Sequence, residues 1–208
     1  MKKYLIFDLG NVMVSFSPID MCRKFIKSED DAKTVCDALF DRLYWDRLDA
    51  GTIEDTELLS EVKKRIPERL FPLAEKIYSS WFLSLPEISG MRELALKLKK
   101  KYSLSLALLS NVGKALWEHE KEIPLLDIFD KKFYSAVIGY TKPSDEIYAY
   151  VCEKLDILPR EAVFVDDNEK NVLSAESFGI KSIKFDGDVQ KLEAKLEEIL
   201  ENKKEPRN

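Results

Sequence analysis

The stretch YLIFDLGNVMV, residues 4–14, begins as a buried strand and then places a carboxylate and a glycine where the strand ends. The apolar residues from Tyr4 to Phe7 run directly into Asp8, and Gly10 follows two residues later. A short continuous apolar run of this kind is typical of a strand that is buried on both faces. The acidic residue that ends it is either a turn former or part of a site, and the rest of the chain decides between the two.

The rest of the sequence alternates between short apolar segments and helix-like stretches. The apolar segments, each short enough for one strand, are residues 103–110, 133–139, 162–167 and 181–187. The helix-like stretches, in which apolar residues recur every three or four positions, are residues 88–101, 145–155, 171–178 and 190–204. Strands that alternate with helices favour a parallel sheet that helices cover on both faces, so we expect an α/β fold.

Residues 15–84 interrupt this alternation, because they contain helical patterns and no convincing strand. One helix is expected to end near Gly51, and Thr52 is expected to cap the next one. We interpret residues 15–84 as a small helical domain that is inserted into an α/β core domain of residues 1–14 and 85–208.

The composition describes a globular protein whose partner is a small molecule. The chain has 208 residues, 45% of them hydrophobic, which is enough for one sizeable core with a small accessory domain. Its 38 acidic and 33 basic residues are mixed along the chain and give a formal net charge of −5. This balance argues against the basic surface of a nucleic-acid-binding protein. The sequence points to no particular protein partner.

The cysteines and the N-terminal residues indicate a cytoplasmic protein. Cys22, Cys36 and Cys152 are odd in number and lack CxxC spacing, as expected of ordinary thiols in a reducing compartment. The apolar run after Lys3 is interrupted by Asp8 long before a secretory segment is complete, and no stretch approaches transmembrane length. We therefore expect neither secretion nor a membrane partner.

Polar side chains follow the predicted strands at their ends, which is where ligands bind in open parallel sheets. They are Asp8, Ser110, Asn111, Asp166, Asp167 and, shortly after the third strand, Lys142. A metal-dependent phosphoryl-transfer site needs these groups: oxygen ligands for a hard cation, donors for phosphate oxygens, and a lysine that balances negative charge.

Each of these residues also has an ordinary structural explanation when it is taken alone. Asp8 can form a turn, and Ser110 with Asn111 can cap a helix. Lys142 can be a solvated surface lysine. The acidic pair after the fourth strand is harder to explain, because two carboxylates against an apolar strand repel each other unless a cation or donors compensate. The combination therefore favours a site.

Four segments in this order resemble the four motifs of the haloacid dehalogenase (HAD) superfamily, and the match covers nearly the whole chain. They are FDLGNVMV at residues 7–14, LLSN at 108–111, GYTKPSDEIY at 139–148 and VFVDDNEKNV at 163–172. The resemblance implies a Rossmann-like parallel sheet in the core. It also makes residues 15–84 a helical cap of the type that closes over small substrates.

The resemblance further implies a role for each strand-end residue. Asp8 would be the nucleophile, and Lys142 would neutralise charge on Asp8 and on the phosphate. The phosphate-binding residues that it implies are Leu9, Gly10, Ser110, Asn111 and Lys142. The Mg²⁺-binding residues that it implies are Asp8, Gly10 through its carbonyl, Asp167 as the main ligand, and Asp166 beside it.

A narrower similarity concerns the cap. FDLGNV together with WDRLDAGTIED, residues 45–55, is similar to the subfamily IA branch that contains bacterial alpha-D-glucose-1-phosphate phosphatase. This similarity makes Trp45 and Arg47 candidates for contact with the substrate. Trp45 is explained more simply as a core aromatic residue of the cap.

The chain departs from the commoner pattern of the superfamily at two positions. Most phosphatases of the superfamily carry, two residues after the nucleophile, a second aspartate that acts as general acid and base; this chain has Gly10 there. The side-chain proton donor is therefore missing, unless a cap residue or an ordered water replaces it. Asn171 stands where many relatives have another aspartate, which weakens the negative charge around the metal.

These features together predict an Mg²⁺-dependent phosphatase that acts on a small phosphate monoester, a sugar phosphate such as glucose 1-phosphate, through an aspartyl-phosphate at Asp8. The anomeric oxygen of a sugar 1-phosphate is a good leaving group and suits a site without a proton donor. A 2-haloacid dehalogenase is the second interpretation, although that reaction needs no metal and gains nothing from a carboxylate pair. A catalytically silent module that binds a phosphorylated metabolite is the third.

Overall fold

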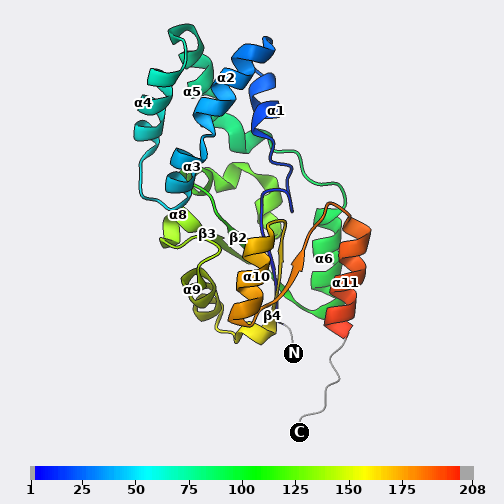
Figure 1. Cartoon of the computed structure of the whole chain (residues 1–208). Helices are drawn as coiled ribbons and strands as arrows, with labels where there is room; N and C mark the ends of the chain where they lie inside the picture. Colours follow the sequence, from blue (N-terminus) through cyan, green and yellow to red (C-terminus); the bar gives the residue numbers. More distant parts are fainter. Residues whose placement is uncertain (1–2, 202–208) are drawn as a thin grey trace.

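The protein is described by a computed structural model over residues 3–201, and its centre is a five-stranded parallel sheet (Figure 1). The strands are β1 (Tyr4–Phe7), β2 (Ser105–Ser110), β3 (Lys131–Tyr134), β4 (Ala162–Asp166) and β5 (Lys181–Lys184). The strand order is β3-β2-β1-β4-β5, which puts the first strand in the middle. Each neighbouring pair is parallel, so the predicted α/β fold is confirmed.

Both faces of β1 are buried, which explains its continuous apolar sequence. Leu5 and Phe7 pack on one face of the sheet with α6 (Met91–Tyr102) and α11 (Val189–Glu201). Ile6 packs on the opposite face with α9 (Asp145–Leu155) and α10 (Glu169–Phe178). The two helix pairs lie on opposite sides of the sheet in Figure 1. A charged side chain is unfavourable in either apolar layer, so Asp8 lies just after the strand, at the edge of the core.

The third strand is shorter than predicted. It ends at Tyr134, and the next residues form the short helix α8 (Ser135–Ile138), which ends at Gly139 with a φ of 81°. The apolar sequence after Tyr134 resembles a strand, but here the chain turns and buries Ser135. The Ser135 hydroxyl accepts a hydrogen bond from the Val112 amide at 2.8 Å, in the loop that follows β2.

Two helices start at residues other than those predicted. α4 (Asp55–Arg65) begins too late for Thr52 to cap it, and the Thr52 hydroxyl instead donates to the Arg47 carbonyl at 3.1 Å. α10 begins two residues before its predicted start, because the side chain of Asn168 caps it. Of the predicted last helix, residues 202–204 lie outside the described residues.

The helices of residues 18–80 form a separate layer above the carboxyl ends of the strands (Figure 1). These cap helices are α1 (Pro18–Arg23), α2 (Glu29–Leu39), α3 (Arg42–Asp49), α4 and α5 (Phe71–Ser80). The remaining short elements are α7 (Lys114–Glu118) and the 3-10 turns Glu68–Leu70, Trp81–Ser84, Glu120–Glu122, Pro124–Ile128 and Pro159–Glu161.

The chain crosses between the sheet layer and the cap helices twice, and the two crossings lie side by side. The Ser15 amide donates to the Pro86 carbonyl at 2.8 Å, and the Ile88 amide donates to the Met13 carbonyl at 2.9 Å. We propose this paired crossing as the boundary between a core of residues 1–14 and 85–208 and a cap of residues 15–84.

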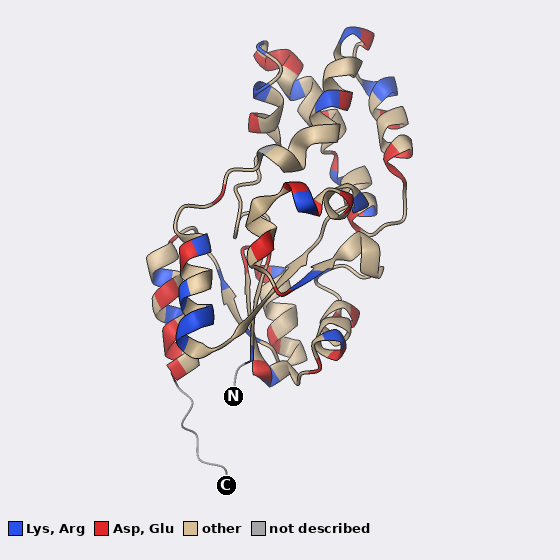
Figure 2. Cartoon of the chain, turned by 180° about the vertical axis from the view of Figure 1, so that it is seen from behind, with Lys and Arg blue, Asp and Glu red and all other residues tan. Residues whose placement is uncertain are grey.

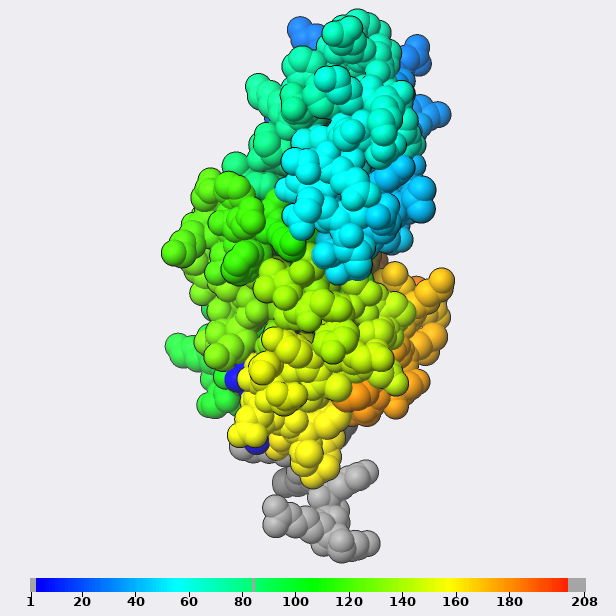
Figure 3. All heavy atoms as spheres, turned by 90° about the vertical axis from the view of Figure 1, so that its left-hand side faces the viewer, coloured from blue at the N-terminus to red at the C-terminus, as the bar shows by residue number. Residues whose placement is uncertain are grey.

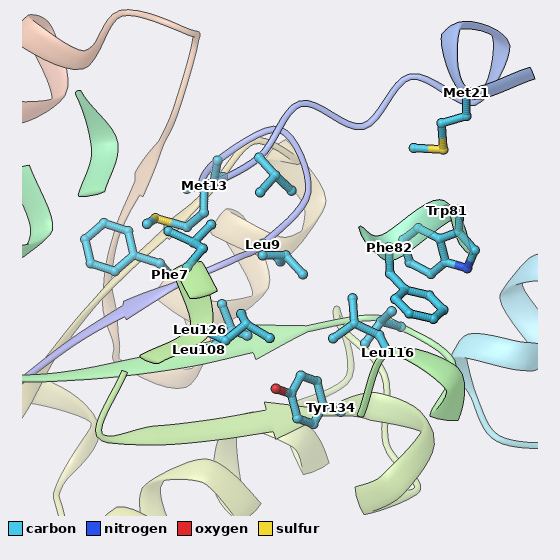
Figure 4. Packing of buried hydrophobic residues seen from close by; sticks show 14 of the residues in the cluster. Phe7, Leu9, Met13, Met21, Trp81, Phe82, Leu108, Leu116, Leu126 and Tyr134 are labelled. Atoms are coloured by element: carbon cyan, nitrogen blue, oxygen red, sulfur yellow. The ribbon is translucent and has the colours of Figure 1, made fainter. Parts of the chain in front are cut away.

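The apolar core continues from the sheet into the cap without a break. Figure 4 shows Leu9 at the end of β1, Leu116 from α7, and the aromatic rings of Phe82 and Trp81 at the end of the cap. All four side chains belong to one buried cluster with Phe7. Dispersion and burial therefore hold the cap against the core.

α3 also contacts the core through backbone atoms. Figure 3 shows the cyan cap residues resting against the green residues of the core. Gly51, just after α3, has a φ of +68°, and a Cβ atom added there would lie 2.6 Å from the Ala136 carbonyl oxygen. The position therefore needs glycine for its conformation and for its close approach to α8.

Gly51→Ala is expected to destabilise the protein by more than Gly139→Ala, as measured by urea denaturation. Both glycines have positive φ, but a Cβ atom at Gly139 meets nothing within 4 Å. The control therefore isolates backbone strain, about 1–2 kcal/mol, and Gly51→Ala adds the clash with Ala136. Equal losses of stability would show that α3 can move away from α8 at no cost.

The described surface mixes charges of both signs. Figure 2 shows Lys, Arg, Asp and Glu interspersed on the outer helices, and Lys101 of α6 pairs with Glu197 of α11 at 2.8 Å. None of the described helices is both long and apolar enough to cross a membrane. The three cysteines are free; Cys22 and Cys152 are buried.

Candidate active site

A cavity of about 500 Å³ lies where the carboxyl ends of the strands meet the cap. Its lining from the core includes Asp8, Leu9, Gly10, Ser110, Asn111, Lys142 and Asp167, and its lining from the cap includes Arg42, Trp45, Asp46, Asp49 and Trp81. The structure thus brings most of the predicted site residues together. Asp166 has no exposed surface and lies behind the cavity wall, and Arg47 is not part of the lining.

The two carboxylate oxygens of Asp8 have different surroundings. Its Oδ1 accepts hydrogen bonds from the Leu9 amide and from Lys142 Nζ, both at 2.8 Å. Its Oδ2 accepts no hydrogen bond from the described residues, and Asp8 lines the cavity, so we expect a ligand to contact this oxygen. Burial raises the pKa of Asp8 to about 6, while the charge of Lys142 acts in the opposite direction.

Lys142 is buried and connects two carboxylates. Its Nζ donates to Asp8 Oδ1, to Asp166 Oδ2 at 2.6 Å and to the Leu109 carbonyl at 3.0 Å, which uses all three ammonium protons. Burial alone lowers the pKa of Lys142, but the charges of Asp8 and Asp166 outweigh it and raise the pKa. Lys142 is therefore a fixed positive charge directly beside Asp8.

Asp166 is saturated by hydrogen bonds and does not face the cavity. Besides Lys142, it accepts from the Asn168 amide at 2.8 Å and from the Asn171 side-chain amide at 3.1 Å. The sequence pattern does not show this role of Asn171. The amide of Asn171 donates hydrogen bonds to the buried Asp166 carboxylate, whereas an aspartate at this position would repel that carboxylate.

Asn111 fixes the loop that carries Lys142. Its side-chain amide donates to the Lys142 carbonyl, and its side-chain oxygen accepts from the Lys142 backbone amide, both at 2.8 Å. Ser110, the last residue of β2, is nearly buried and contributes to the cavity wall. Two of the residues predicted to bind phosphate, Asn111 and Lys142, are thus hydrogen-bonded to each other.

Three carboxylates gather at the floor of the cavity, as in sites that hold a cation. Oxygens of Asp8, Asp166 and Asp167 lie within 4.8 Å of one another. Asp167 is only partly buried and lines the cavity, and its pKa is raised by burial and by the nearby charge of Asp166. Two unlike roles follow: Asp167 is open to a ligand, and Asp166 is occupied by donors of the protein.

The cap contributes an aromatic wall and a pair of charges. Trp45 lines the cavity and also packs against Phe40 and Trp81, with ring centroids 4.7 and 5.6 Å apart, so it is a core residue of the cap as well. The structure places Arg47 elsewhere, paired with Glu57 at 3.1 Å. Arg42, at the start of α3, is the cap arginine that lines the cavity.

Most of the chain matches a known protein family. A profile of the haloacid dehalogenase-like hydrolases matches residues 2–179, so the chain belongs to this family of hydrolases. D-ribitol-5-phosphate phosphatase of Bacteroides thetaiotaomicron is 27% identical over 190 residues, which are 88% of this chain and 91% of that protein. The narrower resemblance to glucose-1-phosphate phosphatase stays a prediction.

Solved structures share the fold. A HAD family enzyme of Bacteroides thetaiotaomicron, in complex with magnesium and inorganic phosphate, superimposes with a TM-score of 0.67 at 23% identity and covers 92% of this chain and 99% of that one. L-2-haloacid dehalogenase of Xanthobacter autotrophicus, with chloropropionic acid covalently bound, gives a TM-score of 0.65 at 18% identity, over 99% and 85% of the two chains. The fold is thus common to both kinds of enzyme, and the site must distinguish them.

Proposed function

We propose that this protein is an Mg²⁺-dependent phosphatase that hydrolyses a small phosphorylated sugar through an aspartyl-phosphate at Asp8. The surroundings of Asp8 support the proposal. Its Oδ1 contacts the Leu9 amide and Lys142 Nζ, and the residue lines a cavity that is large enough for a sugar phosphate. A carboxylate that is oriented in this way beside a fixed cation is suited to attack phosphorus.

The donors at the cavity floor fit a magnesium ion. Asp8 and Asp167 supply carboxylate oxygens, the Gly10 carbonyl can supply a third oxygen, and no soft ligand lines the cavity in the described part of the chain. Asp166 would support the site by holding Lys142 and would not ligate the metal directly. A solved HAD family enzyme with the same fold contains magnesium and inorganic phosphate, which supports magnesium as the ion. When bound, Mg²⁺ offsets the negative charge of the phosphate.

The residues of the chain supply the remaining chemistry. Asp8 Oδ2 attacks phosphorus as the bond from phosphorus to the sugar oxygen breaks, which forms the aspartyl-phosphate and releases the sugar. Water later attacks the same phosphorus, the bond from phosphorus to Asp8 breaks, and inorganic phosphate leaves. Lys142 neutralises charge on Asp8 and on the phosphate oxygens, while Ser110 and the Asn111 amide hold those oxygens. The cap covers the cavity and keeps bulk water away, which strengthens these electrostatic interactions.

The cap side of the cavity supports a sugar as the substrate. Trp45 and Trp81 offer apolar ring faces to the carbon skeleton, and Arg42 with Asp46 offers hydrogen bonds to hydroxyl groups. A relative named for D-ribitol 5-phosphate supports a phosphorylated polyol or sugar of this size. Glucose 1-phosphate remains our candidate within this class, and a panel that also includes glucose 6-phosphate and ribitol 5-phosphate would rank them.

Chelation with EDTA is expected to stop phosphate release, and added Mg²⁺ is expected to restore it. When no cation is bound, the carboxylates at the cavity floor repel each other and also repel the phosphate of the substrate. The assay measures inorganic phosphate from sugar phosphates and, in parallel, chloride from 2-chloropropionate. Chloride release that persists in EDTA, with no release of phosphate, would assign the dehalogenase reaction instead.

Asp167→Ala is expected to raise the Mg²⁺ concentration for half-maximal activity more than Asn171→Ala does. Asp167 is a carboxylate in the cavity, whereas Asn171 acts through Asp166. Loss of an indirect partner typically weakens metal binding by about 10- to 100-fold, and loss of a direct ligand by more. Equal shifts in the two variants would contradict the role assigned to Asp167.

A further inference from the structure

The acid that HAD phosphatases commonly carry two residues after the nucleophile is absent here, so another group must protonate the leaving oxygen. The carboxylates that line the cavity in the described part of the chain are Asp8, Asp46, Asp49 and Asp167. Asp8 and Asp167 lie at the phosphate end, and Asp46 pairs with Arg42 at 2.7 Å. Asp49, the last residue of α3, is the remaining carboxylate.

Asp49 is buried without the partner that a buried carboxylate normally has. Its exposed fraction is 8%, and its Oδ1 has no hydrogen-bond partner among the described residues. It also ends a helix, where the backbone dipole disfavours negative charge. A residue with a purely structural role would be hydrogen-bonded here, because an unpaired buried polar atom costs the folded state stability.

The backbone of Asp49 is tied to the phosphate end of the site. The Ser135 hydroxyl donates to the Asp49 carbonyl at 2.5 Å and accepts from the Val112 amide at 2.8 Å. Val112 directly follows the predicted phosphate-binding residue Asn111, so a single hydroxyl links that loop to the end of α3. Asp49 therefore has a fixed position relative to the phosphate, as a proton donor requires.

Burial and the surrounding charges move the pKa of Asp49 toward neutral pH. Burial, followed by repulsion from Asp46, raises the pKa of Asp49 to about 7; Asp8 adds to this rise, while Arg42 and Lys142 oppose it. From α5, Tyr78 also faces Asp49, and its own pKa is raised chiefly by burial. A carboxyl group that exchanges protons near the working pH is well matched to acid and base catalysis.

We propose that Asp49 of the cap is the general acid and base of this phosphatase and replaces the aspartate that is absent at Gly10. The inference rests on the proposed function. As Asp8 Oδ2 bonds to phosphorus and the bond to the sugar oxygen breaks, the Asp49 carboxyl gives its proton to that oxygen and the sugar leaves as an alcohol. Asp49, now a carboxylate, then takes a proton from the water that attacks the aspartyl-phosphate. The bond from phosphorus to Asp8 breaks, and both aspartates return to their starting states.

The position of Gly10 allows a rescue experiment. A Cβ atom added there would lie 3.8 Å from Phe16 Cβ, which is an ordinary contact, and Gly10 does not have positive φ. Gly10→Asp can therefore introduce a second carboxyl group beside the phosphate without a clash. If Asp49 is the acid, this change should restore activity to a variant that lacks Asp49.

The test compares leaving groups that need a proton with one that does not. In Asp49→Asn, kcat/KM for sugar phosphates is expected to fall by about 10²–10⁴-fold, which is the usual contribution of general acid catalysis. For p-nitrophenyl phosphate, whose phenolate leaves unaided, kcat/KM should change by less than about tenfold. Stopped-flow mixing should show a burst of nitrophenolate, because the aspartyl-phosphate then lacks its base. The matched control is Asp37→Asn, which neutralises an exposed cap carboxylate outside the cavity.

The pH profile gives a second readout. In the wild type, kcat/KM for sugar phosphates should fall as the pH rises through about 7, because the acid is lost there, and this limb should be absent in Asp49→Asn. The variant should be folded and, at pH 8, at least as stable as the wild type. The pKa of Asp49 is higher in the folded state than in the unfolded state. The free energy of unfolding of the wild type therefore decreases as the pH rises from the unfolded pKa to the folded pKa.

Selective loss on sugar phosphates, with recovery of at least about tenfold in Gly10→Asp combined with Asp49→Asn, supports the proposal. Equal losses on both kinds of substrate, or an unchanged rate on sugar phosphates, overturn it and leave the phosphatase function intact. A wild-type protein that releases no phosphate from any of these substrates overturns the proposed function and this inference together.

Discussion

Asp8→Asn is expected to lower phosphate release by at least about 10⁴-fold and to leave the fold intact, because the amide keeps the shape of the side chain and removes the nucleophile. The amide oxygen can still accept from the Leu9 amide and from Lys142, as Asp8 Oδ1 does. The measurement is the release of phosphate from a sugar phosphate, with circular dichroism and thermal unfolding to check the fold.

The covalent intermediate gives this prediction its control. Borohydride reduces an acyl phosphate to an alcohol, so treatment during turnover should convert Asp8 to homoserine in the wild type. Peptide mass spectrometry detects the change, and Asp8→Asn should show none. Turnover at the wild-type rate in a folded Asp8→Asn protein would falsify the mechanism.

Lys142→Met should produce the second-largest effect, on activity and on stability together. The variant leaves Asp8 and Asp166 buried side by side without their shared cation, and removing one partner of a buried ion pair typically costs about 3–5 kcal/mol. We expect a loss of this size in the free energy of unfolding at pH 8, from urea denaturation, and no measurable phosphate release. At pH 5 the loss of stability should be smaller, because burial raises the pKa of Asp8 to about 6 and its protonation relieves the repulsion.

The matched control for this variant is Lys184→Met. Lys184 is exposed and pairs with Glu169 at 3.2 Å on the surface, where an ion pair contributes little. It should leave both stability and activity near the wild type. A Lys142→Met protein as stable at pH 8 as this control would show that Asp8 and Asp166 do not need the Lys142 charge in the fold.

Much of the core could be predicted from local sequence. The apolar run before Asp8 is long enough only for a strand buried on both faces, and the alternation of strands and helices determines that the strands are parallel. Parallel strands place their carboxyl ends at one edge, so Asp8, Ser110 and Lys142 were expected to meet there. The structure brings them to one cavity. The length of the third strand was predicted wrongly, because the chain turns after Tyr134 and Ser135 makes a tertiary hydrogen bond there.

The neighbouring aspartates show where local sequence stops being informative. Asp166 and Asp167 have the same chemistry. Asp166, the last residue of β4, contacts Lys142 and Asn171, whereas Asp167, just after the strand, lines the cavity. Which of the two is saturated depends on donors that come from elsewhere in the chain. Lys142 itself follows β3 by several residues, and the side chain of Asn111 fixes its loop.

The sequence by itself determined the sheet, the groups at its carboxyl edge and the presence of a helical insertion, because these depend on apolar periodicity and on the order of strands. Only the tertiary structure decided which cap residues face the site. Arg42 and Asp49 line the cavity and Arg47 does not, although all three lie on α3. The direction of a side chain on a short helix depends on how that helix docks, and α3 docks through Gly51 against Ala136 and through Ser135. Those contacts join residues far apart in the chain, so no local pattern contains them.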